Sequence, residues 1–261
     1  MTRGETLPRF EMAETVTAMI GCRLRESPEQ KSRIEGTSAI LKSRVPQLRC
    51  YVQAMPRHMA IEAFREHQWA DRYAPHIAPV NEYVDELREE GRGWAPYVAP
   101  MHGGVEARVL SILRDPGPAT QDEVGSGFIC VENDDGSAEL QAVLLEEAGI
   151  SPFELLPWNA YPWYINRAPK ASELDAGVET ILHLLELAPK VKIVLLQGGD
   201  ADHAWRRLLR IAPTIERDGG LTVVRTFHPS PQALFVRDLE QRAARVARRR
   251  EAFHEVAALL N

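Results

Sequence analysis

The sequence predicts a three-layer αβα sandwich with a central, mainly parallel four-stranded sheet, preceded by a mostly helical N-terminal extension. Four short stretches rich in Leu, Ile and Val are typical of buried strands, and they lie at 107–113, 153–158, 191–197 and 221–227. Helical patterns follow them at 137–149, 172–188, 201–212 and roughly 232–260. Strands that alternate with helices of this length indicate βαβ units and a parallel sheet covered on both faces.

The part of the chain before residue 105 shows no strand as clear as those four. Helical patterns occur at about 58–72 and 80–91, and a connector rich in Gly, Pro and aromatic residues follows at 93–104. We therefore expect a helical extension over residues 1–104 and an α/β domain over residues 105–261.

Polar residues at the predicted helix starts suggest specific caps. Ser137 is a candidate cap for the helix at 137–149. Ser172 is a candidate cap for the helix at 172–188, with Asp175 at the third helical position.

The composition is that of a globular protein and limits the classes of protein to which the chain can belong. Of the 261 residues, 44% are hydrophobic and 26% are charged, as in ordinary globular proteins. The N-terminal stretch has no apolar leader pattern, and no apolar run approaches the length of a membrane span, so we expect a cytoplasmic protein that does not enter a membrane. Cys22, Cys50 and Cys130 are far apart, which predicts reduced thiols and no metal site.

The net charge is −6, but charge is unevenly distributed. Between residues 217 and 250, eight Arg stand against Asp218, Asp238 and Glu240, which leaves a local balance of +5. Such a stretch suits a phosphate backbone, and it equally suits the solvated face of a C-terminal helix.

Three of the predicted strands end beside a residue able to do chemistry. Asp115 follows the first strand in Arg-Asp-Pro-Gly-Pro, Asn159 follows the second, and His228 follows the last in Phe-His-Pro-Ser-Pro. In open parallel sheets, ligands bind beyond the carboxyl ends of the strands. Taken singly, Asp115 also fits a plain Asp-Pro turn, Asn159 a turn or cap, and His228 a structural role. Their common position makes them a candidate site.

Together these signatures resemble the uracil-DNA glycosylase superfamily. The Asp-Pro at Asp115 looks like its water-activating motif, Asn159-Ala160 like its base-reading Asn, and Phe-His-Pro-Ser-Pro like its DNA-contacting loop. Phe128 lies thirteen residues after Asp115, the offset of the Phe that stacks on the flipped base in uracil-specific members. The Gly198-Gly199 turn also falls where the superfamily has a Gly. The similarity covers about residues 105–250.

The resemblance implies a role for each matching residue. Asp115 would position the attacking water and stabilise the sugar cation, and His228 would donate to the departing base. Asn159 would read the base edge, and Phe128 would supply the stacking surface. The hydroxyl of Ser230 and backbone N–H groups near Gly199 would hold phosphates.

Three positions depart from the uracil-specific pattern. Gly117 stands where those enzymes have a bulky Tyr that excludes thymine, so the resemblance implies a more open base site. Gln232 replaces a Leu wedge, which implies different handling of the duplex. Arg114 precedes Asp115 and could pair with its carboxylate or with a phosphate. The four cysteines of the iron–sulphur branches are absent, so we expect no cofactor and no metal.

The resemblance implies a DNA glycosylase that flips out uracil or a related deaminated base and hydrolyses its N-glycosidic bond in base excision repair. One alternative is a glycosylase that excises an enlarged, modified base from phage DNA in antiviral defence. Another is a nucleic-acid-binding protein with weak catalysis. In each case the expected partner is DNA, single- or double-stranded, and we expect a monomer.

Overall fold

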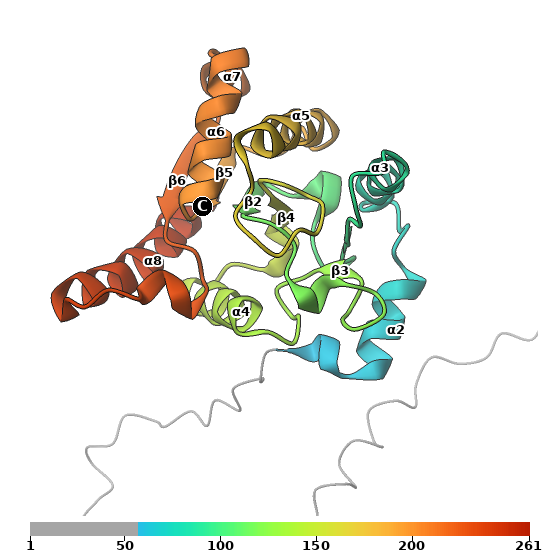
Figure 1. Cartoon of the computed structure of the whole chain (residues 1–261), viewed down its shortest axis with the longest axis horizontal. Helices are drawn as coiled ribbons and strands as arrows, with labels where there is room; N and C mark the ends of the chain where they lie inside the picture. Colours follow the sequence, from blue (N-terminus) through green and yellow to red (C-terminus); the bar gives the residue numbers. More distant parts are fainter. Residues whose placement is uncertain (1–56) are drawn as a thin grey trace, which may run out of the picture. The chain divides into compact units, whose positions relative to one another are not determined.

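A parallel four-stranded sheet forms the centre of the part of the chain that the structure, a computed structural model, describes, which is residues 57–261 (Figure 1). Its strand order is β4-β2-β5-β6. The strands are β2 (Val109–Leu113), β4 (Leu155–Asn159), β5 (Ile193–Gln197) and β6 (Thr222–Thr226). The parallel sheet expected from the four apolar stretches is confirmed. Cys22, Cys50 and the first half of the expected extension lie outside the described residues.

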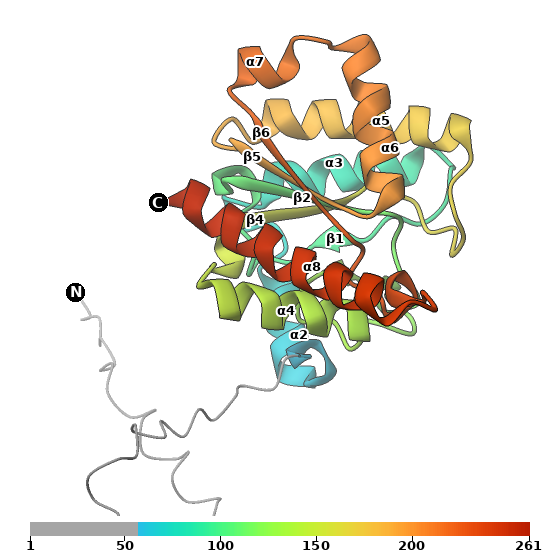
Figure 2. The same cartoon turned by 90° about the vertical axis from the view of Figure 1, so that its left-hand side faces the viewer.

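Helices cover both faces of this sheet. They are α2 (Glu62–Ala70), α3 (Ala78–Glu89), α4 (Gly136–Ala148), α5 (Ala171–Leu187), α6 (Gly199–Ile211), the short α7 (Ile215–Gly219) and α8 (Leu239–Leu260). Figure 2 shows α3, α5 and α6 on one side of the strands and α4 and α8 on the other. The three-layer αβα sandwich predicted from the sequence is therefore confirmed.

The side chains of the strands divide between two apolar clusters, as the alternation of a strand requires. Leu110 and Ile112 of β2 belong to the cluster beneath α3, α5 and α6. Val109 of the same strand packs with Leu144 of α4 and Phe253 of α8 in the other. Because both faces are buried, the inner strands are largely apolar, and this is why they were recognisable in the sequence.

Residues 57–104 contribute to the same core as the sheet. Met59, Val80 and Val84 belong to one apolar cluster with Leu110 and Ile112. The region also contains β1 (Tyr97–Val98), which pairs in parallel with β3 (Phe128–Ile129) in a second, two-stranded sheet. Two-residue strands give no period in a sequence, so this sheet was not predicted. The domain boundary after residue 104 stays a prediction.

Short 3₁₀ turns occupy several connections, and some helix starts differ from those predicted. The turns are η1 (His58–Ala60), η2 (Gly104–Glu106), η3 (Pro118–Thr120), η4 (Pro152–Glu154) and η5 (Pro231–Leu234). The helix expected from residue 232 begins instead at Leu239, where the Asp238 side chain accepts hydrogen bonds from the backbone N–H groups of Glu240 and Gln241. The preceding residues form η5, because its Pro231 start suits a tight turn.

Neither predicted cap is correct, because other residues cap both helices. Asp135, and not Ser137, caps α4 by accepting hydrogen bonds from the backbone N–H groups of Ser137 and Ala138. At the start of α5, the Glu173 side chain accepts a hydrogen bond of 2.6 Å from the Lys170 N–H. Neither Ser172 nor Asp175 performs that role, because the helix begins at Ala171, one residue before the predicted start.

Candidate active site

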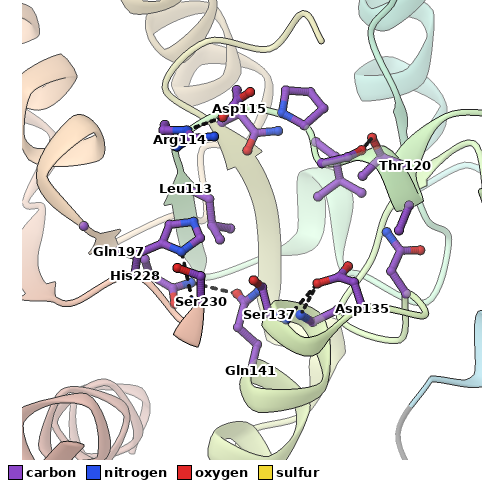
Figure 3. A pocket seen from close by; sticks show the side chains of 18 of the residues that line it. Leu113, Arg114, Asp115, Thr120, Asp135, Ser137, Gln141, Gln197, His228 and Ser230 are labelled. Atoms are coloured by element: carbon purple, nitrogen blue, oxygen red, sulfur yellow. Dashed lines mark hydrogen bonds and ion pairs between the residues drawn. The ribbon is translucent and has the colours of Figure 1, made fainter. Parts of the chain in front are cut away.

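A cavity of about 620 Å³ lies beyond the carboxyl ends of the sheet strands. Strand register explains why its lining converges: Leu113 of β2 lies opposite Asn159 of β4, and Gln197 of β5 lies opposite Thr226 of β6. The loops that leave these strands therefore start side by side. The predicted site residues that line the cavity are Arg114, Asp115, Gly117, Asn159, Gly199, His228, Ser230 and Gln232 (Figure 3).

The carboxylate of Asp115 is almost fully enclosed at this cavity. Its side chain is 2% exposed, and the Arg114 Nε donates a hydrogen bond to its Oδ1. Its Oδ2 is buried and has no hydrogen-bond partner among residues 57–261. Burial raises the pKa of Asp115 above its usual value, while the neighbouring Arg114 and the backbone N–H groups of Asn166 and Arg167 act in the opposite direction. The site thus holds an enclosed carboxylate that Arg114 orients through Oδ1.

Asn159 presents an unengaged amide from the end of β4. The residue is 3% exposed and lines the cavity, yet its side chain makes no hydrogen bond within the described part of the chain. The next residues are fixed by the backbone, because the Ala160 N–H donates to Leu113 O at 2.8 Å and the Tyr161 N–H donates to Arg114 O at 3.0 Å. These bonds tie the Asn159 strand end to the Asp115 loop. The amide can therefore offer both donors and an acceptor to a ligand.

His228 is a neutral imidazole in this environment. Burial lowers its pKa to about 4, and the positive charges of Arg114 and Arg249 add to the effect. The Ser230 N–H donates a hydrogen bond of 3.0 Å to His228 Nδ1. Because Nδ1 accepts, the neutral ring carries its proton on Nε2, which is then the donor of the pair. The ring can thus donate to a partner without carrying a charge itself.

Two contacts fix the loop that carries His228. The buried Arg249 of α8 donates from Nη2 to the carbonyl oxygens of His228 and Ser230, the latter at 2.9 Å. On the other side, Gly198 has a φ of +107°, and a Cβ built on it would lie 3.1 Å from the Cβ of His228. Gly at this position therefore permits both the turn after β5 and the close approach of the loop.

The remaining glycines of the predicted site border open space. A Cβ built on either Gly117 or Gly199 would meet no atom within 4 Å. Gly117 follows Asp115 by two residues, so the cavity is wide beside the carboxylate. Gly199 is the first residue of α6, whose N-terminus carries unpaired backbone N–H groups and a partial positive charge.

Phe128 is the one predicted site residue that the structure does not bring to the cavity. It is fully buried, its ring centroid lies 4.8 Å from that of Trp69, and it also packs near Tyr97. Pairing of β3 with β1 directs the ring into this aromatic cluster. Ile129 and Cys130, the next residues, line the cavity instead. The spacing of thirteen from Asp115 did not predict which side chain of β3 faces the site.

The basic stretch near the site is largely engaged within the protein. Arg245 donates to Ala233 O, Arg248 donates to Arg225 O, and Arg250 pairs with Glu147. With the buried Arg249, four of the five arginines of α8 make intramolecular contacts. Much of this charge therefore serves the packing of α8.

Sequence reasoning missed several polar residues of the cavity, namely Asn133, Asp135, Gln141, Asn166 and Gln197. Gln197 had a signal, because it ends β5 and so obeys the same rule as Asn159. Among the described residues, no group of three or more His, Cys, Asp or Glu is placed to hold a metal ion. No helix within residues 57–261 is long and apolar enough to cross a membrane.

Fold and site together define an α/β protein whose ligand cavity lies at the carboxyl edge of a parallel sheet and gathers an acid, an amide and a neutral imidazole. A family model described as "Uracil DNA glycosylase superfamily" matches residues 100–253, which is more than half of the chain. The chain belongs to the uracil-DNA glycosylase superfamily, as its motifs indicated. Membership places it, in general terms, among DNA glycosylases, hydrolases that act on DNA in repair. No curated protein shows significant similarity to it.

Proposed function

We propose that this protein is a monofunctional DNA glycosylase that removes uracil or a related deaminated base, flipped out of its strand into the cavity. One observation carries the proposal. A single cavity holds the enclosed carboxylate of Asp115, the unengaged amide of Asn159 and the neutral ring of His228. These are the three kinds of group that hydrolysis of an N-glycosidic bond needs: one at the sugar, one at the base edge and one at the base oxygen.

The steps follow from the charges that develop. When the bond between C1′ and the base nitrogen breaks, the electron pair leaves with the base and the sugar becomes oxocarbenium-like. His228 Nε2 donates a hydrogen bond to the anionic base, and Asp115 stabilises the cation. The Asp115 carboxylate accepts a hydrogen bond from the water that attacks C1′. The proton that the water releases neutralises the base, so the products are a free base and an abasic sugar.

A neutral His228 suits this chemistry. An imidazolium would lower the barrier only if the site could bear its charge, and burial together with Arg114 and Arg249 opposes that charge. A neutral N–H donor on a largely buried ring still forms a strong hydrogen bond to an anion. Ser230, Gln232 and the N-terminus of α6 at Gly199 would contact the backbone of the DNA.

A second substrate class has one specific observation in its favour. The open space at Gly117, directly beside Asp115, would admit a base larger than uracil. An enzyme that excises an enlarged, modified base from phage DNA would use the same three groups. The identity of the cleaved base separates the two candidates.

The test uses labelled oligonucleotides, single- and double-stranded, that carry uracil, hypoxanthine, xanthine, a thymine mismatch, or hydroxymethylated or glucosylated cytosine. Each is incubated with the wild type, with Asp115→Asn or with Asp71→Asn, and abasic sites are then cleaved with alkali. We expect cleavage at a deaminated base, a rate reduced by about 10²- to 10⁴-fold in Asp115→Asn, and no change in Asp71→Asn, whose carboxylate lies on the surface after α2.

Three results bear on the alternatives. Cleavage confined to the enlarged cytosines would replace repair by defence against modified DNA. DNA binding without cleavage of any substrate would leave a nucleic-acid-binding protein and overturn the catalytic proposal. The pH profile gives a further check: since Asp115 must be ionised and its pKa is raised, the rate should begin to fall on acidification at a pH above the usual aspartate range.

A further inference from the structure

Two glutamine side chains form a buried pair in the wall of the cavity. Gln197 ends β5 and is 1% exposed, and Gln141 of α4 is 6% exposed. The Gln197 Nε2 donates hydrogen bonds to Gln141 Oε1 at 2.8 Å and to Ser111 Oγ at 2.9 Å. Both glutamines line the cavity (Figure 3). We call these two residues the amide pair.

The amide pair has one donor group and one acceptor left over. A primary amide offers two N–H donors and one carbonyl acceptor. Gln197 uses both of its donors and Gln141 uses its acceptor, which leaves Gln197 Oε1 and Gln141 Nε2 without a hydrogen-bond partner in residues 57–261. Neither is among the unpartnered atoms that are completely enclosed by protein. Because both side chains line the cavity, these two atoms are the hydrogen-bonding groups that the amide pair can offer to a ligand there.

This outcome does not depend on which way the amides face. If both are turned over, the Ser111 hydroxyl and Gln141 Nε2 donate to Gln197 Oε1. Gln197 Nε2 then becomes the free donor, and Gln141 Oε1 becomes the free acceptor. In either arrangement the amide pair offers one donor beside one acceptor to whatever enters the cavity.

The position of the amide pair relative to Asp115 limits what it can touch. In Figure 3, Gln141 lies at the opposite end of the drawn site from Asp115. Because Asp115 acts at the sugar, a group that contacts the amide pair belongs to the part of the base farthest from the sugar. A purine reaches farther from its glycosidic nitrogen than a pyrimidine does, and the open space at Gly117 accommodates its second ring.

We propose that the amide pair recognises the distal edge of a purine-sized base that carries a donor next to an acceptor, as the N1–H and O6 of hypoxanthine do. This rests on the proposed glycosylase function and assigns that site a deaminated purine as substrate class. Asn159 remains a separate reading group at the end of β4. A base with that edge pairs both groups of the amide pair, whereas a base without it displaces water from them and leaves them unpaired.

The experiment measures binding apart from cleavage. Duplexes carry a 2′-fluoro nucleotide, which resists hydrolysis, with hypoxanthine, unsubstituted purine or uracil as the base. Affinities are measured for the wild type, Gln141→Leu and Gln141→Glu. Gln141→Glu keeps the length of the side chain and an oxygen that can accept from Gln197 Nε2, and it replaces the NH₂ group by an anionic oxygen, so it tests the loss of the donor without shortening the side chain. Thermal unfolding of each variant is recorded alongside.

We expect both variants to bind the hypoxanthine duplex about 10- to 100-fold more weakly than the wild type, with the uracil and unsubstituted purine duplexes changed less than threefold. Equal weakening of all three duplexes, or no weakening of any, would overturn the proposal for the amide pair. If the wild type cleaves uracil and Asp115→Asn does not, such a result leaves the glycosylase function intact. If the wild type cleaves no base and prefers no probe, both proposals fail.

Discussion

The close approach between Gly198 and the His228 loop makes Gly198→Ala a sharp test of how the site is held. An added Cβ would lie 3.1 Å from His228 Cβ and 3.5 Å from His228 N, so the loop must give way by a few tenths of an ångström. It would also have to adopt a φ of +107°, which L side chains rarely do. Strain of this kind costs on the order of 1–3 kcal/mol.

Displacement of the His228 loop should lower the cleavage rate, because it moves His228 Nε2 away from the base to which it donates. A misplacement of about 1 Å in a catalytic geometry can cost about 100-fold, so a shift of a few tenths should cost roughly 10-fold. The strain should lower the melting temperature by roughly 2–10 °C in a domain of this size. Single-turnover cleavage of the preferred oligonucleotide gives the first quantity, and thermal denaturation followed by circular dichroism gives the second.

Gly136→Ala is the matched control. Gly136 is the first residue of α4 and has no positive φ, and an added Cβ there would meet nothing within 4 Å. It should cleave and unfold like the wild type. If Gly198→Ala also cleaved and unfolded like the wild type, the argument that this glycine sets the position of His228 would be refuted. If it lost stability but kept its rate, strain would be confirmed and the positioning argument would fail.

Two further residues give separate tests. His102 is fully buried with a pKa lowered to about 4, because its ring is desolvated, while Nδ1 donates to Pro152 O and Nε2 accepts from Val131 N–H. The stability contributed by its neutral form is present above the unfolded pKa of about 6.5 and is lost as the pH falls towards 4, so roughly 2–3 kcal/mol should disappear between pH 7 and 4.5. Urea unfolding gives the free energy of unfolding at both pH values, and its loss on acidification should be smaller in His102→Gln than in the wild type. An equal loss in both proteins would contradict the role given to His102. Arg249→Met removes the donor to the carbonyls around His228 and should lower kcat about 10-fold with a smaller change in KM, whereas Arg108→Met, at the far end of β2, should leave both unchanged.

Most of the fold was predictable because its central strands are buried on both faces. Nearly all residues of β2, β4 and β5 are buried, so each strand appears as a mainly apolar run bounded by turn residues. The edge strand β6 exposes Thr222 and Arg225, and its shorter apolar stretch still sufficed because a helix follows it. The site then followed from one rule, since a parallel sheet gathers the residues that end its strands.

The errors have a common physical cause. In each case the sequence allows more than one arrangement of the same residues, and three-dimensional packing selects between them. Ser137 and Asp135 are both good N-cap residues two positions apart, and the start of α4 selects the carboxylate. Phe128 has the expected spacing from Asp115, but pairing of β3 with β1 directs its ring towards Trp69. The two-residue strands that cause this are too short to leave a periodic signal.

Gln141 is the instructive omission, because a signal for it exists on its own helix. Ala138, Leu144 and Leu145 are the buried apolar residues of α4, and Gln141 falls on the same face at helical spacing. A polar residue on an apolar face is more informative than an apolar residue on a polar face, since burial without a partner is costly. Its partner Gln197 is likewise a polar end to an apolar strand. Where a helix and a strand each place an amide in the core beside a cavity, the two amides satisfy one another only in part, and the hydrogen-bonding capacity left over is available to a ligand.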